Sequence, residues 1–444
     1  MGLPGASIWP GARLRPRGPG LLRVRGTVLA LLVTAGLCSG VPAGATPPHK
    51  PPPAQKATGG KRPPPAAQQR NADADGVAEA RLIAIYKLIG QGRNRQALAG
   101  AEALVRSHPN FQLAQLVYGD LLSGMTRPVR VLGDAPPALA AAAGPALAEL
   151  REESALRLKA LRERPPAGTV PSQLLALSQR NKHVIAVDAS RARLYLFENT
   201  PAQGLKLVAD YYISVGKSGI EKAAEGDLRT PLGVYFITSQ LHRKSLKEFY
   251  GSGALPINYP NPYDTIRGKT GSGIWLHGTP PNQFSRAPKA TDGCVVLANP
   301  DLEHLIRTVE VRSTPVVIAP ALQWVSPSAL KGPRAAFEQT LAAWQAARTT
   351  GNLSKVVPFY TTDFTSNGKT FEQWLPTLER EVAAGAGRPV QTKDLSVLHW
   401  KDVAETMVVT FAELPAHART GPTRRQYWIK VQGQWKIFFE GVIG

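Results

Sequence analysis

Residues 271–302 read GSGIWLHGTPPNQFSRAPKATDGCVVLANPDL and combine a strand pattern with reactive side chains. The apolar run Ile274–Leu276 is typical of a buried strand and places His277 at its end. Cys294 follows Gly293 and starts a second apolar run. Because a thiol of ordinary pKa is mostly protonated near neutral pH, a nucleophilic cysteine needs a neighbouring base. We therefore expect Cys294 to be a nucleophile and His277 its general base.

The cysteine count directs attention to the same residue. The chain contains two cysteines, and Cys38 lies in a segment that we expect to be removed. A lone Cys294 in an exported chain is a buried structural residue, an intermolecular bridge or a nucleophile. Gly293 permits close approach of the backbone to a substrate, so we place the oxyanion-binding amides in its region.

Charge and the N-terminal sequence limit the compartment and the partners. Lys and Arg number 53 against 32 Asp and Glu, so the net charge of +21 favours an acidic partner. Nucleic acid, anionic lipid and an anionic wall polymer all fit this charge. Arginines precede an apolar run at 28–37 and the small residues Ala43–Ala45, a pattern that predicts a signal peptide at 1–45. Export to the periplasm or cell envelope would remove nucleic acid from the list. Residues 46–76 are rich in proline, which predicts a Pro-rich disordered linker.

The remaining chain predicts three folded domains. Residues 77–165 carry apolar side chains at helical spacing and resemble a tetratricopeptide-like helix pair, which predicts a small all-α domain. Residues 170–325 alternate apolar and polar side chains between turns, which predicts a mostly β, mostly antiparallel domain. Residues 333–444 place helices before strands, and this α+β order resembles the nuclear transport factor 2-like fold. The helical domain is a spacer or a binding module, and a homodimer through it or through the C-terminal domain stays open.

The order His-Gly, spacer, Thr-Asp-Gly-Cys resembles the signature of the YkuD family of L,D-transpeptidases. The segments VIAVDASRARLYLFE and GDLRTPLGVYFI resemble two further landmarks of that family. The resemblance implies a thioester on Cys294, a base at His277 and a backbone carbonyl at Gly278 that orients the ring. It also implies that the protein acts on peptidoglycan stem peptides.

Two departures from the family pattern affect substrate recognition. Many members carry His and Arg where this chain has Asp292 and Val296. A substrate carboxylate must then bind elsewhere, and the remaining candidates are basic, polar or aromatic side chains near the motif. They are Arg286, Lys289 and Arg267, with Thr291, Tyr259 and Tyr263 as further contacts.

The three-domain layout resembles the helical-cell-shape L,D-carboxypeptidases. The resemblance leaves three functions: an L,D-transpeptidase in wall cross-linking, an L,D-carboxypeptidase that trims tetrapeptide stems to tripeptides, and a wall-binding scaffold without turnover. No cofactor is expected. No metal is expected either, because His277 belongs to no set of residues with metal-ligand spacing.

Overall fold

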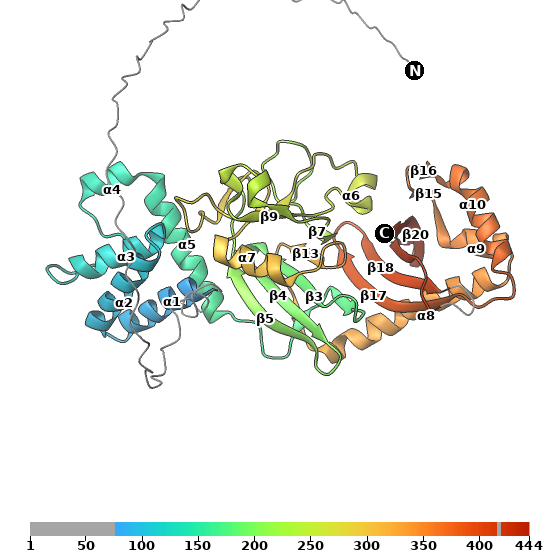
Figure 1. Cartoon of the computed structure of the whole chain (residues 1–444), viewed down its shortest axis with the longest axis horizontal. Helices are drawn as coiled ribbons and strands as arrows, with labels where there is room; N and C mark the ends of the chain where they lie inside the picture. Colours follow the sequence, from blue (N-terminus) through green and yellow to red (C-terminus); the bar gives the residue numbers. More distant parts are fainter. Residues whose placement is uncertain (1–75, 415–418, 444) are drawn as a thin grey trace, which may run out of the picture. The chain divides into compact units, whose positions relative to one another are not determined.

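The computed structural model describes residues 76–414 and 419–443. They form a helical N-terminal region, a β-rich central region and a mixed α and β C-terminal region, which confirms the expected fold class (Figure 1). The predicted signal peptide and nearly all of the Pro-rich linker lie outside the described residues. In the part of the chain that the structure describes, no helix has the length and apolar character to cross a membrane.

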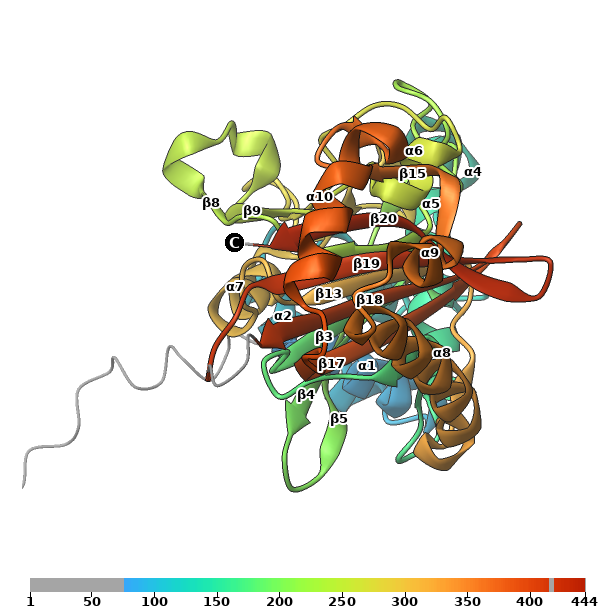
Figure 2. The same cartoon turned by 90° about the vertical axis from the view of Figure 1, so that its right-hand side faces the viewer.

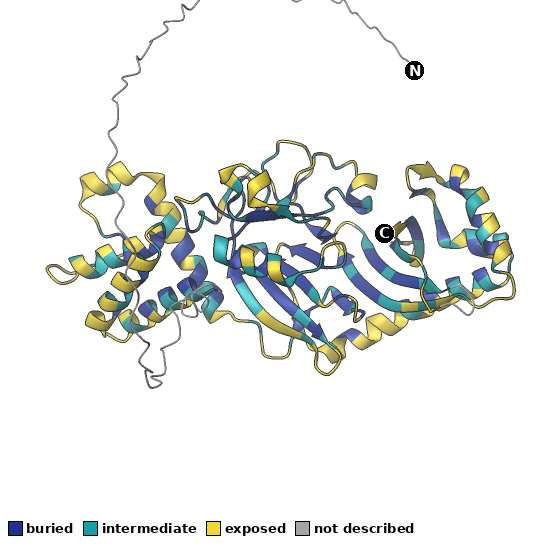
Figure 3. Cartoon of the chain, in the orientation of Figure 1, coloured by how far each residue is buried: buried dark blue, intermediate teal, exposed yellow. Residues whose placement is uncertain are grey.

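The described N-terminal region consists of helices whose apolar side chains meet on one side. The helices are α1 (Val77–Gly90), α2 (Asn94–Ser107), α3 (Gln112–Ser123), α4 (Pro137–Ala143) and α5 (Pro145–Arg162). Leu82, Ile85 and Leu104 are buried, whereas many other side chains of these helices are exposed (Figure 3). Phe284 of the central region belongs to the same buried cluster. One helix face therefore serves both the small core and a contact with the central region.

A five-stranded sheet forms the base of the central region. Its order is β5-β4-β3-β13-β7, in which β3 and β13 are parallel and the other neighbours antiparallel. The strands are β3 (His183–Asp188), β4 (Arg193–Thr200), β5 (Gly204–Tyr212), β7 (Gly233–Phe236) and β13 (Pro315–Ala319). Ile185, Leu196 and Val317 are fully buried between its strands and the surrounding layers.

A second sheet carries the residues predicted to be reactive. Its order is β12-β10-β9-β8, and β10 runs parallel to β12. The elements are β8 (Leu241–His242), η2 (Arg243–Ser245), η3 (Glu248–Tyr250), β9 (Gly253–Pro256), α6 (Pro262–Ile266), β10 (Trp275–His277), β12 (Val295–Val296) and α7 (Asn299–Thr308). Two short pairs complete the region: β6 (Val215–Gly216) with β11 (Lys289–Thr291), and β1 (Val170–Pro171) with β14 (Trp324–Val325).

In the C-terminal region, helices α8, α9 and α10 cover one face of a curved sheet (Figure 2). The elements are α8 (Lys331–Thr349), α9 (Leu353–Val356), β15 (Tyr360–Ser366), β16 (Lys369–Thr370), α10 (Phe371–Ala384), β17 (Gln391–Lys401), β18 (Glu405–Leu414), β19 (Thr423–Val431) and β20 (Gln434–Ile443). Aromatic contacts join helix to sheet, since the rings of Phe337 and Trp344 pack edge-on against Trp428.

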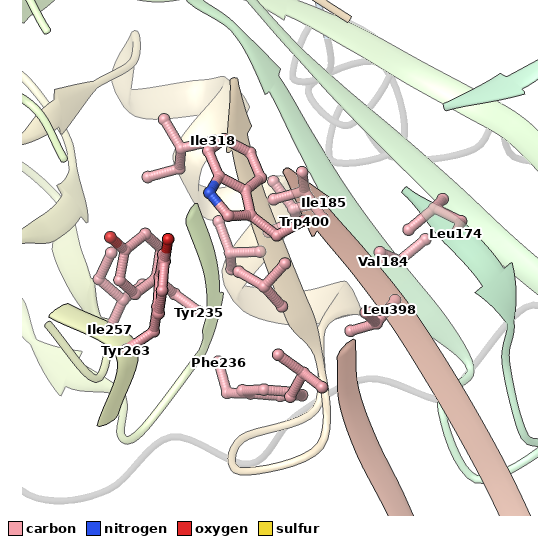
Figure 4. Packing of buried hydrophobic residues seen from close by; sticks show 14 of the residues in the cluster. Leu174, Val184, Ile185, Tyr235, Phe236, Ile257, Tyr263, Ile318, Leu398 and Trp400 are labelled. Atoms are coloured by element: carbon pink, nitrogen blue, oxygen red, sulfur yellow. The ribbon is translucent and has the colours of Figure 1, made fainter. Parts of the chain in front are cut away.

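The central and C-terminal regions share one hydrophobic core. The strand β2 (Leu174–Ala176) precedes the central sheet in sequence but pairs with β17 at the edge of the C-terminal sheet. In Figure 4, Trp400 of β17 lies beside Ile185 and Ile318 of the central sheet. The two regions therefore pack against each other and are not independent domains joined by a flexible linker.

Candidate active site

A cavity of about 170 Å³ contains the reactive residues that the sequence predicts. Cys294 and His277 both line it, together with Arg286 and Lys222. A second cavity, of about 220 Å³, lies between the central and C-terminal regions, and neither cysteine nor histidine lines it. The first cavity is therefore the candidate active site, because it contains both a nucleophile and a base.

The pairing of β10 with β12 brings Cys294 and His277 together. Leu276 is in register with Val295, and the two strands are parallel. His277 is the last residue of β10 and Cys294 directly precedes β12, so the pairing of these strands places the two residues near each other. The imidazole and the thiol both line the same cavity.

His277 is held in the form of a neutral base. Its Nδ1 lies 2.7 Å from the carbonyl oxygen of Gly278, and a carbonyl only accepts, so Nδ1 carries the proton. Nε2 is then free to accept one. Burial lowers the pKa of His277 to about 4, although the Gly278 bond works in the opposite direction. The ring of Tyr250 packs edge-on against the imidazole with centroids 5.0 Å apart.

The Cys294 thiol is protonated in the resting site. Its Sγ lies 3.5 Å from the carbonyl oxygen of Gly273. Burial raises the pKa of the thiol, while the positive charges of Arg286 and Lys222 lower it. The resting pair is therefore a neutral thiol beside a neutral imidazole, and the thiolate forms when the proton moves to His277.

Two cationic side chains border the thiol. The guanidinium of Arg286 lies over the ring of Phe249, 4.2 Å from its centroid. Lys222 is buried, and its Nζ donates to the carboxylate of Asp227 at 2.8 Å. Arg286 was predicted from the sequence, whereas Lys222 was missed because it lies in a loop far upstream of the motif. Its only sequence signal is its nearness to the GDLRTP landmark.

Gly293 and Thr291 shape the cysteine turn through hydrogen bonds. Gly293 has φ +121°, and a Cβ there would lie 2.7 Å from the carbonyl oxygen of Arg229. The Thr291 hydroxyl donates to the Cys294 carbonyl and accepts the N–H of Gly293 at 3.1 Å. The Gly293 amide is therefore bonded within the turn, and the expectation of oxyanion-binding amides in this region stays a prediction. Thr291 lines the cavity, but its hydroxyl is committed to this turn.

Other predicted contacts lie outside the cavity lining. Tyr259 is buried, and its hydroxyl donates to the carbonyl of Thr270, so its expected place as a substrate contact is corrected to the core. Lys289 is exposed on β11. Arg267 and Tyr263 both bond to Asp402 of the C-terminal region.

Asp292 forms a surface ion pair with Lys217, with 2.9 Å between Oδ1 and Nζ. Both side chains are more than half exposed, so the pair contributes little to stability. In the part of the chain that the structure describes, no group of three or more His, Cys, Asp and Glu side chains is placed to hold a metal ion.

The thiol environment predicts how Cys294 reacts with an alkylating reagent. Iodoacetamide alkylation is expected to be slow at about pH 7 and to rise above about pH 9, because burial raises the thiol pKa above its ordinary 9.0. Arg286→Ala is expected to raise that pKa further, since the guanidinium favours the thiolate. Asp292→Ala is expected to lower it, since the carboxylate has the opposite effect. The rate on the Cys294 peptide, followed by mass spectrometry against pH, measures both shifts, and shifts in the same direction would contradict this account.

The fold and the cavity define a β-rich domain in which a cysteine and a histidine line one site, and comparisons with known proteins identify the domain family. Residues 182–318 match the YkuD L,D-transpeptidase catalytic domain, and residues 336–441 match the Cds6 C-terminal NTF2-like domain. The chain therefore contains a YkuD L,D-transpeptidase domain followed by an NTF2-like domain.

The structure is similar to solved structures that each match a little over 60% of this chain. Bd1075 of Bdellovibrio bacteriovorus is 25% identical, with a TM-score of 0.52, over 62% of this chain and 98% of that chain. The helical cell shape determining protein Pgp2 of Campylobacter jejuni is 21% identical, with a TM-score of 0.48, over 61% of this chain and 95% of its own. No curated protein sequence gives a significant match.

Proposed function

We propose that the protein is an L,D-transpeptidase-type acyltransferase that acts through Cys294 on peptidoglycan stem peptides. The observation that carries this proposal is the cavity that Cys294 and His277 share at the paired strands β10 and β12 of the YkuD domain. YkuD domains act on peptidoglycan stem peptides, and the Gly278 bond leaves the imidazole in the tautomer that a general base needs.

The chemistry proceeds in two acyl-transfer steps. The thiol proton passes to Nε2 of His277 as Cys294 Sγ attacks the carbonyl carbon of the L-centre residue at stem position three. The imidazolium then protonates the leaving amine of the terminal D-alanine, and a thioester remains. In the second step His277 takes a proton from the acyl acceptor, which attacks the thioester and releases the thiol.

Many family members carry an arginine at the position of Val296. In this chain Arg286 and Lys222 take its place in binding the substrate carboxylate. A guanidinium matches a carboxylate with two parallel N–H groups, so Arg286 suits the substrate carboxylate. Lys222 is paired with Asp227 and contributes mainly positive potential. Both side chains lie in the lining that contains Cys294.

The same charges favour a second function, that of an L,D-carboxypeptidase. The acceptor in cross-linking is an amine, which is cationic until it loses its proton, and like charges repel in a partly buried cavity. Water carries no such penalty. Hydrolysis of the thioester trims tetrapeptide stems to tripeptides, an activity that would serve the control of cell shape.

The proposal includes export to the cell envelope, where these stem peptides are found. The predicted signal peptide at 1–45 and the excess of basic side chains support this location. A homodimer through the helical or C-terminal domain remains a prediction.

The deciding experiment incubates the mature protein, and its Cys294→Ala variant, with purified tetrapeptide muropeptides and follows the products by mass spectrometry. Products that depend on the thiol are expected. Dimers with 3-3 links identify a transpeptidase, and tripeptides identify a carboxypeptidase. If neither product forms, the protein is a wall-binding scaffold and the proposal is wrong.

A further inference from the structure

The segment 280–288 connects β10 to β11 and carries Arg286 to the cavity, yet it is held largely by the N-terminal helices. The N–H of Phe284 donates to the carbonyl of Asn110 at 3.0 Å, and the Asn110 side chain donates to the carbonyl of Pro281 at 3.0 Å. The Phe284 ring stacks on Phe111 with centroids 4.3 Å apart. The turn before α3 therefore holds the first half of the segment in place by hydrogen bonds and a ring contact.

The helix α5 holds the residue that directly precedes Arg286. The Ser285 hydroxyl donates to Oε1 of Glu153 at 2.8 Å. The same carboxylate is paired with Arg157 at 2.7 Å, and the two side chains are 3% and 2% exposed. Burial and pairing hold this carboxylate in place. The carboxylate in turn fixes the position of the Ser285 hydroxyl that donates to it.

The backbone of Arg286 itself is held by a tyrosine that contacts the same buried arginine. The Tyr212 hydroxyl donates to the Arg286 carbonyl at 3.0 Å, and the guanidinium of Arg157 lies 3.9 Å from the centroid of the Tyr212 ring. The Ser214 hydroxyl donates to the next carbonyl, that of Ala287. Consecutive residues of the segment are thus bonded, and the entropy cost of ordering the loop falls on folding rather than on substrate binding.

We propose that the N-terminal helical region positions the substrate-binding loop of the catalytic domain. Glu153 acts through Ser285, and Asn110 and Phe111 act through Pro281 and Phe284, so that Arg286 faces Cys294. Glu153 and Asn110 are positioning residues, since neither lines the cavity. The inference rests on the proposed function for the role of Arg286 as a carboxylate binder, while the placement of Arg286 beside the thiol is independent of substrate.

The test uses the mature chain with Ser285→Ala and Asn110→Ala, separately and together. Both substitutions remove one bond and leave the Glu153–Arg157 pair intact. The combined variant is expected to raise KM for the tetrapeptide stem about 3- to 10-fold while kcat changes less than about 2-fold. The thiol pKa from Cys294 alkylation is expected to rise toward that of Arg286→Ala, because a displaced guanidinium lowers it less.

Matched variants separate positioning from general structural damage. Asn282→Ala changes an exposed asparagine of the same segment and is expected to leave KM and the thiol pKa unchanged. Ser285→Thr keeps the hydroxyl and is expected to retain the wild-type KM. In an Arg286→Ala background, Ser285→Ala is expected to have no further effect, since both changes act through one side chain.

The inference is overturned if the combined variant keeps both the wild-type KM and the wild-type thiol pKa, or if its effects add fully to those of Arg286→Ala. Failure of the proposed function gives a different result. Turnover would then be absent from the unmodified chain, while alkylation, which needs no substrate, would still report whether the helical region places Arg286 beside Cys294.

Discussion

Replacement of His277 by glutamine is expected to lower kcat/KM for stem-peptide cleavage by about 10³-fold, within the range that general acid–base catalysis supplies. His277 Nδ1 donates to the Gly278 carbonyl at 2.7 Å and leaves Nε2 as the base, whereas the glutamine amide is similar in size to the imidazole but has no basic nitrogen. It cannot accept the thiol proton, and the raised pKa of Cys294 leaves little thiolate without a base. Steady-state kinetics on a purified tetrapeptide stem measures the loss.

The two reactive residues are expected to behave as one unit. Cys294→Ala removes the nucleophile, and the double variant with His277→Gln is expected to fall no further than Cys294→Ala alone. His242→Gln is the matched control, because this histidine is exposed on β8. Retention of more than about a tenth of wild-type kcat/KM by His277→Gln would exclude His277 as the general base.

Arg157→Ala is expected to lower the free energy of unfolding by about 3 to 5 kcal/mol, the usual cost of breaking a buried ion pair from one side. Arg157 bonds to Glu79 and Glu153 at 2.7 Å each, and all three side chains are less than a tenth exposed. Burial raises the pKa of Glu79, but Arg193 and Arg157 outweigh it and bring that pKa to about 2. Without Arg157, two buried carboxylates lose a shared counter-ion.

The chain offers a matched control for this prediction. Arg106 pairs with Glu102 at the same four-residue spacing as Arg157 with Glu153, but the side chains are 76% and 50% exposed. Arg106→Ala is therefore expected to cost no more than about 0.5 kcal/mol. Urea unfolding of the two variants measures the difference, and values within about 1 kcal/mol of each other would contradict the account of the buried cluster.

Local patterns were sufficient for the fold class and for the prediction of Cys294 and His277 as a candidate reactive pair. The alternation of apolar and polar residues predicted the hairpin that β3 and β4 form, and helical spacing predicted α1 and α2. Periodicity of this kind depends on neighbours a few positions apart, so it is readable in one sequence. Cys294 and His277 were also recognisable as candidates, because one short segment carries both: His277 ends β10, and Cys294 directly precedes the strand β12 that pairs with it.

Local patterns did not distinguish a cavity wall from a core. Tyr259 and Arg286 both lie near the motif, yet Tyr259 is packed inside while Arg286 borders the thiol. The sequence also did not show that the Gly293 amide donates to the Thr291 hydroxyl of its own turn. Lys222 enters the cavity from a loop with no reactive pattern of its own.

Residues distant in sequence account for these differences. The strand β2 joins the C-terminal sheet across more than two hundred positions, as its pairing of Val397 with Ala176 shows. Glu153 accepts a hydrogen bond from Ser285, 132 positions away, between two regions that the sequence presents as separate. The amino-acid pattern specifies which faces must be buried and which side chains can react. Their partners are selected when packed faces exclude water, since the free energy of that burial depends on surfaces that meet only in the folded chain.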